Sequence, residues 1–148
     1  MKKIKYCGMF FCLVFFNTSI FAQKSTLPKK VFETFDKKYQ KVEEVQWEVK
    51  SKGDYKITFE LEGKKTVVEI DEDGTWEKTS THISFDELPQ VVQTTVNEQK
   101  KNSEITEIKI VINDDNETYY RVDLTDESKT IKLEINKKGK IIKSETEK

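Results

Sequence analysis

Two carboxylates at alternate positions of a short polar turn are the clearest candidates for chemistry in this chain. Asp71 and Asp73 precede a glycine, and counted from Glu69 the acids alternate as they do in a calcium-binding loop. The twelfth position of such a loop would be Ser80, which is not a bidentate glutamate. A second turn, at residues 136–139, carries lysines where ligands would stand. We therefore favour a plain hairpin turn, with a divalent-ion site at Asp71 and Asp73 as the alternative.

His82 is the only histidine of the chain. A catalytic histidine needs an acid to orient it and a nucleophile within hydrogen-bond reach. Neither Ser80 nor Ser84 stands in a recognisable nucleophile motif, and both cysteines, Cys7 and Cys12, fall in a segment that we expect to be removed. The sequence therefore predicts a protein that is not an enzyme and that needs no cofactor.

Aromatic and arginine side chains are candidates for contact with a partner, because they supply much of the energy of protein interfaces. Trp47 stands on the apolar side of an alternating segment, which favours core packing. Trp76 directly follows a turn, where a strand can slip by one residue and expose its side chain. We predict Trp76, Tyr119 and Arg121 as binding residues.

Residues 1–22 have the composition of a secretory signal peptide. Three lysines precede a run from Tyr6 to Phe16 that is nearly all apolar, and we expect cleavage after Ala22. The run is too short to span a bilayer comfortably, since a spanning helix needs about 20 apolar residues. We therefore predict an exported protein, periplasmic or secreted, that has no stable membrane anchor after cleavage.

The charge of the chain argues against a nucleic-acid partner. It has 26 lysines and arginines against 27 aspartates and glutamates, and three of the lysines lie in the predicted signal peptide. Arg121 is the only arginine. Binding to phosphates needs a clustered basic face, whereas lysine and glutamate are interspersed here as on a solvated surface.

A strand, a glycine turn and a returning strand occur twice, at residues 68–76 and 133–141. Each hairpin belongs to a longer pattern of one apolar helical stripe followed by segments that alternate with period two. The sequence therefore predicts an α+β fold of two tandem repeats, residues 27–83 and 84–148, within a single domain of residues 23–148. Each repeat is expected to hold one helix and a four-stranded antiparallel sheet, with the helices on one sheet face. The two units would share a core or join edge to edge into a longer sheet, and the favoured picture is two helices on one side of an antiparallel sheet of about eight strands.

The helix of the second repeat has a distinct start signal. Ser84 and Glu87 stand at capping-box spacing, but Pro89 would remove a hydrogen bond inside a helix that began there. We therefore expect a short turn first and the helix proper near Pro89.

The alternation also predicts which strand residues face water on the side away from the helices. These residues are Gln46, Glu48, Lys50, Lys56, Thr58, Glu60, Glu69, Lys109, Arg121, Asp123, Lys132 and Glu134.

These motifs together resemble the PepSY-like family of exported bacterial proteins, also described as β-lactamase-inhibitor-like. The resemblance rests on Leu27-Pro28, Trp47, the strand of Tyr55 and Phe59, and the Ile70-Asp-x-Asp-Gly-x-Trp motif, and it runs to about residue 143. It implies a helix-plus-sheet fold that binds its target through a concave sheet. It also implies a distant likeness to PepSY domains of protease propeptides, with their inhibitory role.

The resemblance therefore favours a non-enzymatic module for protein–protein interaction or inhibition, whose partner is another envelope or secreted protein. The alternative is a small-molecule or divalent-ion binding protein. The predicted water-facing positions are poor in aromatic residues, with Tyr119 as the exception, and no cysteine remains after residue 22. Both features differ from the β-lactamase inhibitor that names the family and argue against that particular target.

Overall fold

The computed structural model describes residues 27–50 and 53–148, so the predicted signal peptide lies outside the described residues. Within them the chain forms two α-helices, one short 3-10 helix and eight strands. The order is α1 (Lys29–Lys38), β1 (Glu43–Val49), β2 (Tyr55–Leu61), β3 (Lys64–Ile70), β4 (Trp76–His82), η2 (Phe85–Glu87), α2 (Gln90–Lys100), β5 (Glu104–Asn113), β6 (Thr118–Thr125), β7 (Thr130–Asn136) and β8 (Ile141–Glu147).

The eight strands form one antiparallel sheet in chain order, from β1 at one edge to β8 at the other. β4 and β5 pair directly over residues 78–82 and 109–113. The prediction of two repeats, each with a four-stranded sheet of its own, is therefore wrong. Two separate sheets would leave the backbone N–H and C=O groups along β4 and β5 unpaired, and pairing these two edges satisfies them both.

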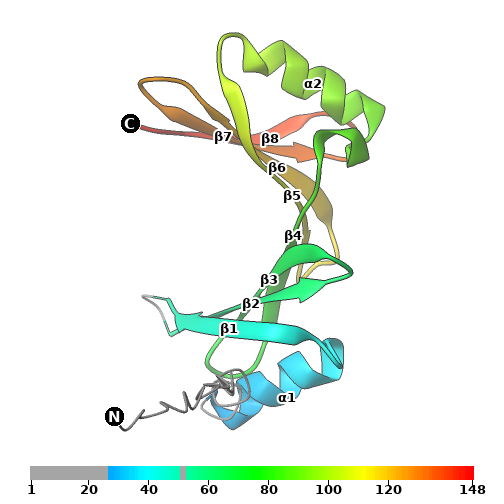
Figure 1. Cartoon of the computed structure of the whole chain (residues 1–148), viewed down its shortest axis with the longest axis vertical. Coiled ribbons are helices and arrows are strands. Elements are labelled where there is room, and N and C mark those ends of the chain that lie inside the picture. The colour runs from blue at the N-terminus through cyan, green and yellow to red at the C-terminus, as the bar shows by residue number, and fades with distance from the viewer. Residues whose placement is uncertain (1–26, 51–52) are drawn as a thin grey trace, which may run out of the picture.

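Both helices cover the same face of this sheet. The cross-strand pairs Ile57–Val68, Val68–Thr79 and Thr79–Ile112 carry one face from β2 to β5. The pairs Ile110–Tyr120 and Tyr120–Ile135 continue it to β7. Figure 1 shows the sheet bending along its length, with α1 and α2 on the outer side of the bend near its two ends. The opposite side of the sheet, which we call the helix-free face, lines the inside of the bend.

Each helix closes its own hydrophobic core against the sheet. α1 buries Val31 and Phe35, at helical spacing, and Phe35 packs edge to face on Phe59 with ring centroids 5.2 Å apart. α2 buries Val92 and Val96 in the same way. Residues of the first core are Leu27, Val31, Phe35, Val45, Ile57, Phe59, Val68 and Ile70. Residues of the second core are Leu88, Val92, Val96, Ile108, Tyr120, Val122, Leu124, Leu133 and Ile135.

The start of α2 confirms the sequence prediction. A short 3-10 turn, η2, precedes the helix, which begins at Gln90 directly after Pro89. The Glu87 carboxylate accepts hydrogen bonds from the Ser84 backbone N–H at 2.9 Å and from its hydroxyl at 3.1 Å. The Glu87 backbone N–H donates in return to the Ser84 carbonyl oxygen at 3.2 Å, and these contacts fix the chain where it leaves the sheet for the helix.

Neither helix of the described residues is long and apolar enough to cross a membrane.

Candidate binding face

A row of mostly small or apolar side chains crosses the middle of the helix-free face. Direct pairing across β2 to β7 aligns its members, which we call the central row. The central row consists of Thr58, Val67, Ser80, Val111, Tyr119 and Asn136.

Two valines of the central row are buried although neither helix covers this face. Val111 is 1% exposed and Val67 is 8% exposed, and Ser80 lies between them in the row. Tyr119 is paired with Val111 and is half-buried. Burial raises the pKa of the Tyr119 hydroxyl, and the nearby Glu134 carboxylate raises it further. The row is thus an apolar centre with an aromatic residue and a hydroxyl at one side.

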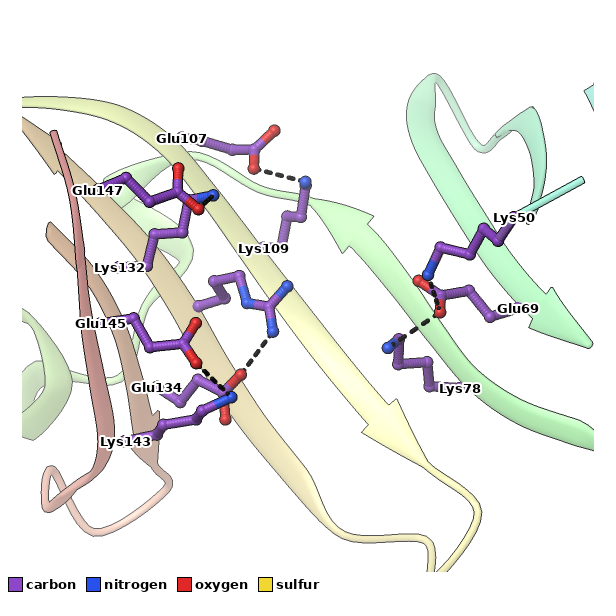
Figure 2. A network of polar contacts seen from close by, with 11 residues as sticks. Lys50, Glu69, Lys78, Glu107, Lys109, Lys132, Glu134, Lys143, Glu145 and Glu147 are labelled. Atoms are coloured by element: carbon purple, nitrogen blue, oxygen red, sulfur yellow. Dashed lines mark hydrogen bonds and ion pairs between the residues drawn. The ribbon is translucent and has the colours of Figure 1, made fainter. Parts of the chain in front are cut away.

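Ion pairs flank the central row on one side. The Glu69 carboxylate lies 2.6 Å from Lys50 Nζ and 3.0 Å from Lys78 Nζ, and only 13% of its side chain is exposed. Burial disfavours the charged form of Glu69, but the two lysines outweigh that penalty and lower its pKa. Figure 2 shows this group on the sheet, apart from a second, larger group of charged side chains.

The second group lies on β5 to β8, on the other side of the central row. Its clearest pair joins Arg121 Nη2 to Glu134 Oε1 at 2.5 Å across β6 and β7. Burial opposes the positive charge of Arg121, but the bond to Glu134 outweighs it and raises the Arg121 pKa. Lys132 pairs with Glu147 at 2.6 Å and Lys143 with Glu145 at 2.8 Å (Figure 2).

One carboxylate in this group is poorly compensated. Asp123 Oδ1 is buried and has no hydrogen-bond partner among the described residues. Burial raises the Asp123 pKa, and so does Glu107, which is its direct cross-strand neighbour. Glu107 in turn lies 2.5 Å from Lys109 and 3.7 Å from His82 Nε2. The face therefore keeps an acceptor oxygen whose hydrogen-bonding capacity is unused.

The structure brings two of the three predicted binding residues together. Tyr119 and Arg121 are alternate residues of β6, and both lie on the helix-free face. Trp76 lies on the other face, packed against the core under α1. Its indole N–H donates to the Thr79 hydroxyl at 3.0 Å, and Lys38 Nζ lies 3.7 Å from the ring centroid. Trp76 therefore does not share a surface with the other two residues.

The two acids of the β3–β4 turn have structural partners. Asp71 Oδ1 accepts the Thr75 backbone N–H at 2.8 Å, and Asp73 pairs with Lys30 Nζ at 3.0 Å. These contacts are those of a hairpin turn held against α1. Within residues 27–50 and 53–148, no group of three or more histidine, cysteine or acidic side chains is placed to hold a metal ion.

A surface hollow of about 710 Å³ lies between the start of β5 and the β6–β7 turn. Small-molecule sites are usually lined by apolar and aromatic side chains with a few polar groups among them. The residues that line this hollow are all polar: Asn102, Glu104, Thr106, Thr125, Asp126, Glu127 and Ser128.

Sequence reasoning missed the apolar centre of the helix-free face. Val67 and Val111 stand at positions that period-two alternation assigns to water, each beside a helix-side neighbour, Val68 or Ile110. An apolar residue at a predicted water-facing position was the available signal. The apolar centre is recognised only when β3 and β5 are compared, because Val67 and Val111 are both paired with Ser80 of β4, which lies between them.

The fold is shared with three solved structures from Bacteroides. A protein of a domain-of-unknown-function family from Bacteroides ovatus is 23% identical, with a TM-score of 0.75 over 82% of this chain and 88% of that one. A protein described as "putative periplasmic" from Bacteroides eggerthii is 17% identical, with a TM-score of 0.74 over 80% and 88% of the two chains. A BLIP-like protein from Bacteroides fragilis is 21% identical, with a TM-score of 0.69 over 80% and 85%.

No curated protein matches the chain. The family model described as "Putative beta-lactamase-inhibitor-like, PepSY-like" matches residues 54–143, which is more than half of the sequence and includes seven of the eight strands in whole or in part. The chain belongs to the PepSY-like family.

Proposed function

We propose that this protein is an exported, non-enzymatic binding module that holds another envelope or secreted protein on its helix-free face. The observation that carries the proposal is the central row, in which two valines are buried on a sheet face that neither α1 nor α2 covers. The two valines are already buried in the free chain and form the floor of the face, and the partly exposed Ser80 and Tyr119 beside them are the side chains of the row that a partner contacts.

The surroundings of the central row suit a protein partner. Charged side chains of both signs flank it, and those at Glu69 and Arg121 are already paired within the chain. Such a rim excludes water from the centre and selects the partner by complementary charge. Tyr119 adds a half-buried aromatic surface with a hydroxyl.

The sheet itself favours binding because it is rigid before the partner arrives. The residues of the face are held by continuous pairing from β1 to β8, so little conformational entropy is lost when they are covered. The family description and the name of the Bacteroides fragilis relative support an inhibitor-like role. The predicted signal peptide directs the protein out of the cytoplasm, so that its partners would be proteins of the envelope or outside the cell.

Photocrosslinking in the native host tests this proposal with the full chain. A photoreactive phenylalanine analogue replaces Tyr119 in one strain and Glu98, which is exposed on α2, in a control strain. We expect a crosslinked species of defined mass from position 119 and none from position 98. Adding Ser80→Arg, which puts a long charged side chain into the central row, should abolish the crosslink without unfolding the protein.

Two results would overturn the proposal. Equal crosslinking from positions 119 and 98 would mean that the helix-free face has no special role. No crosslink from position 119, in a strain where the protein is exported and folded, would mean that this face holds no partner.

A further inference from the structure

We propose that two copies of this chain join through β8, strand against strand, in an antiparallel pair centred on Ser144. The contact is independent of the proposed function, because it uses the edge of the sheet and not its face. β8 is the last strand of the sheet and pairs only with β7 among the described strands. Residues 142–147 are all exposed. An edge of this kind presents unpaired N–H and C=O groups that can pair with a second strand.

The charges of β8 select one register for this pair. In a symmetric antiparallel pair, a residue a given number of positions before the centre stands opposite the residue the same number of positions after the centre in the other copy. Directly opposite residues share a face. Centred on Ser144, it sets Lys143 opposite the other copy's Glu145, and Glu145 opposite the other copy's Lys143. Centred one residue earlier or later, it sets Lys143 against Lys143 or Glu145 against Glu145. Like charges directly opposite each other destabilise a pair, so the register on Ser144 is favoured.

The same register continues the charge pattern of the helix-free face. Within the chain, Arg121 pairs with Glu134, and Glu134 stands opposite Lys143 at the edge. One row further, Lys132 stands opposite Glu145. From β6 to β8 the charge alternates along both rows, and each row ends at β8. A second copy adds Glu145 to the row that ends in Lys143, and Lys143 to the row that ends in Glu145.

The other edge of the sheet is less suited to such a pair. A bulge interrupts β1 between Glu43 and Gln46, and Glu44 has a positive φ of 53°. The regular part of β1 is therefore only four residues, Gln46 to Val49. The irregularity in β8 falls at its start, beside Ile141, so pairing is continuous from Lys143 to Glu147. Bulges bend a strand away from a flat edge and hinder further pairing.

The two-fold axis of this pair stands perpendicular to the sheet at Ser144. Both helix-free faces then lie on the same side, and the sheet becomes one of sixteen strands. The dimer would thus present two central rows side by side to a partner.

Sedimentation of the exported chain over a range of concentrations tests the proposal. We expect a reversible monomer–dimer equilibrium that weakens as salt is raised, because the new ion pairs are exposed. Lys143→Glu and Glu145→Lys each place like charges opposite each other twice, and each should raise the dissociation constant by about tenfold or more. The double variant K143E/E145K restores opposite charges in the same register and should recover dimerisation.

The double variant separates this register from a general effect of charge. Glu127→Lys, in the exposed β6–β7 turn, changes the net charge as Glu145→Lys does and should leave the dimer unchanged. Thermal unfolding of each variant verifies that the monomer is intact. A wild-type chain that stays monomeric at millimolar concentration would overturn the proposal, and so would a double variant as defective as the single ones.

Discussion

The hydroxyl of Thr34 on α1 donates a hydrogen bond to the carbonyl oxygen of Gly74, at 2.6 Å, in the turn between β3 and β4. Thr95 on α2 makes the same bond to Gly139 at 2.7 Å, in the turn between β7 and β8. Each helix is therefore fastened to a glycine turn about forty residues later in the chain. These two contacts tie each helix to the sheet in addition to the packing of its core.

Replacing Gly74 by alanine should destabilise the fold more than the same change at Gly63. Both glycines have positive φ, +85° and +74°, so alanine costs about 1 kcal/mol at either position. A Cβ at Gly74 would also lie 2.8 Å from the Lys30 carbonyl oxygen of α1, whereas nothing lies within 4 Å at Gly63. We expect an excess loss of about 1–3 kcal/mol for Gly74→Ala, measured by urea unfolding.

Gly63→Ala is the matched control, because it carries the same conformational cost without the contact. Equal losses at the two positions would show that α1 can move away from the turn at no cost. In that case the bond between Thr34 and Gly74 would not determine where the helix lies.

The sequence predicts the local structure of this protein well because each local choice has a nearby cause. Period-two alternation places the strands, and the glycine turns place the hairpins. The pairing of strands that are far apart in the sequence has no such local cause. β4 carries Thr79, Ser80 and Thr81 in its middle, which do not show whether its outer edge pairs or stays open. Whether the two units share only a core or join edge to edge is therefore decided only by the structure, in which β4 pairs with β5.

The candidate binding face is likewise predicted from the sequence only in part. Alternation predicts that Arg121 and Asp123 point away from the helices, because that depends only on strand parity. It does not predict that Arg121 is paired with Glu134 while an oxygen of Asp123 is left without a partner. Those differences depend on the register between strands and on the depth at which each side chain lies.

Glu87→Gln should destabilise the protein at neutral pH and lose its effect in acid. The Glu87 carboxylate accepts hydrogen bonds from Lys64 and from Ser84, and these lower its pKa from 4.5 to about 2. A carboxyl group with a depressed pKa stabilises the folded state above its unfolded pKa and loses that contribution as it is protonated. The deficit of the variant should therefore shrink as the pH falls from 4.5 toward 2. Chemical denaturation over this range measures it, with the exposed Glu98→Gln as control. If Glu87→Gln lowered the free energy of unfolding equally at every pH, the depressed pKa of Glu87 would not be the cause of its effect.

Asp123→Asn should raise the melting temperature at neutral pH. Burial and the neighbouring Glu107 raise the Asp123 pKa above 3.8, so its charged form is disfavoured in the folded state. Ionisation of such a group lowers the stability of the folded state as the pH rises through the folded pKa of the group. Asparagine does not ionise, so the variant avoids this loss of stability. The advantage of the variant should disappear as the pH falls below 3.8, where the aspartate is protonated in both states. A lower melting temperature for Asp123→Asn at neutral pH would mean that the attraction of Lys132 and Lys109 outweighs burial.

The single histidine offers a direct measurement on the helix-free face. Burial and the nearby Lys109 lower the His82 pKa below 6.5, against the opposing effect of Glu107. A histidine with a depressed pKa stabilises the fold above its unfolded pKa and loses that contribution as the pH falls through its folded pKa. The stability of the wild-type protein relative to His82→Gln should therefore fall as the pH drops below 6.5.

Proton NMR measures this pKa without assignment, because the chain contains one histidine. Lys109→Gln should raise the measured pKa of His82 and Glu107→Gln should lower it, since the two neighbours act in opposite directions. The pair of variants tests the arrangement of charges around His82 as well as its burial. A pKa at or above 6.5 in the wild-type protein would show that Glu107, 3.7 Å away, dominates the site instead.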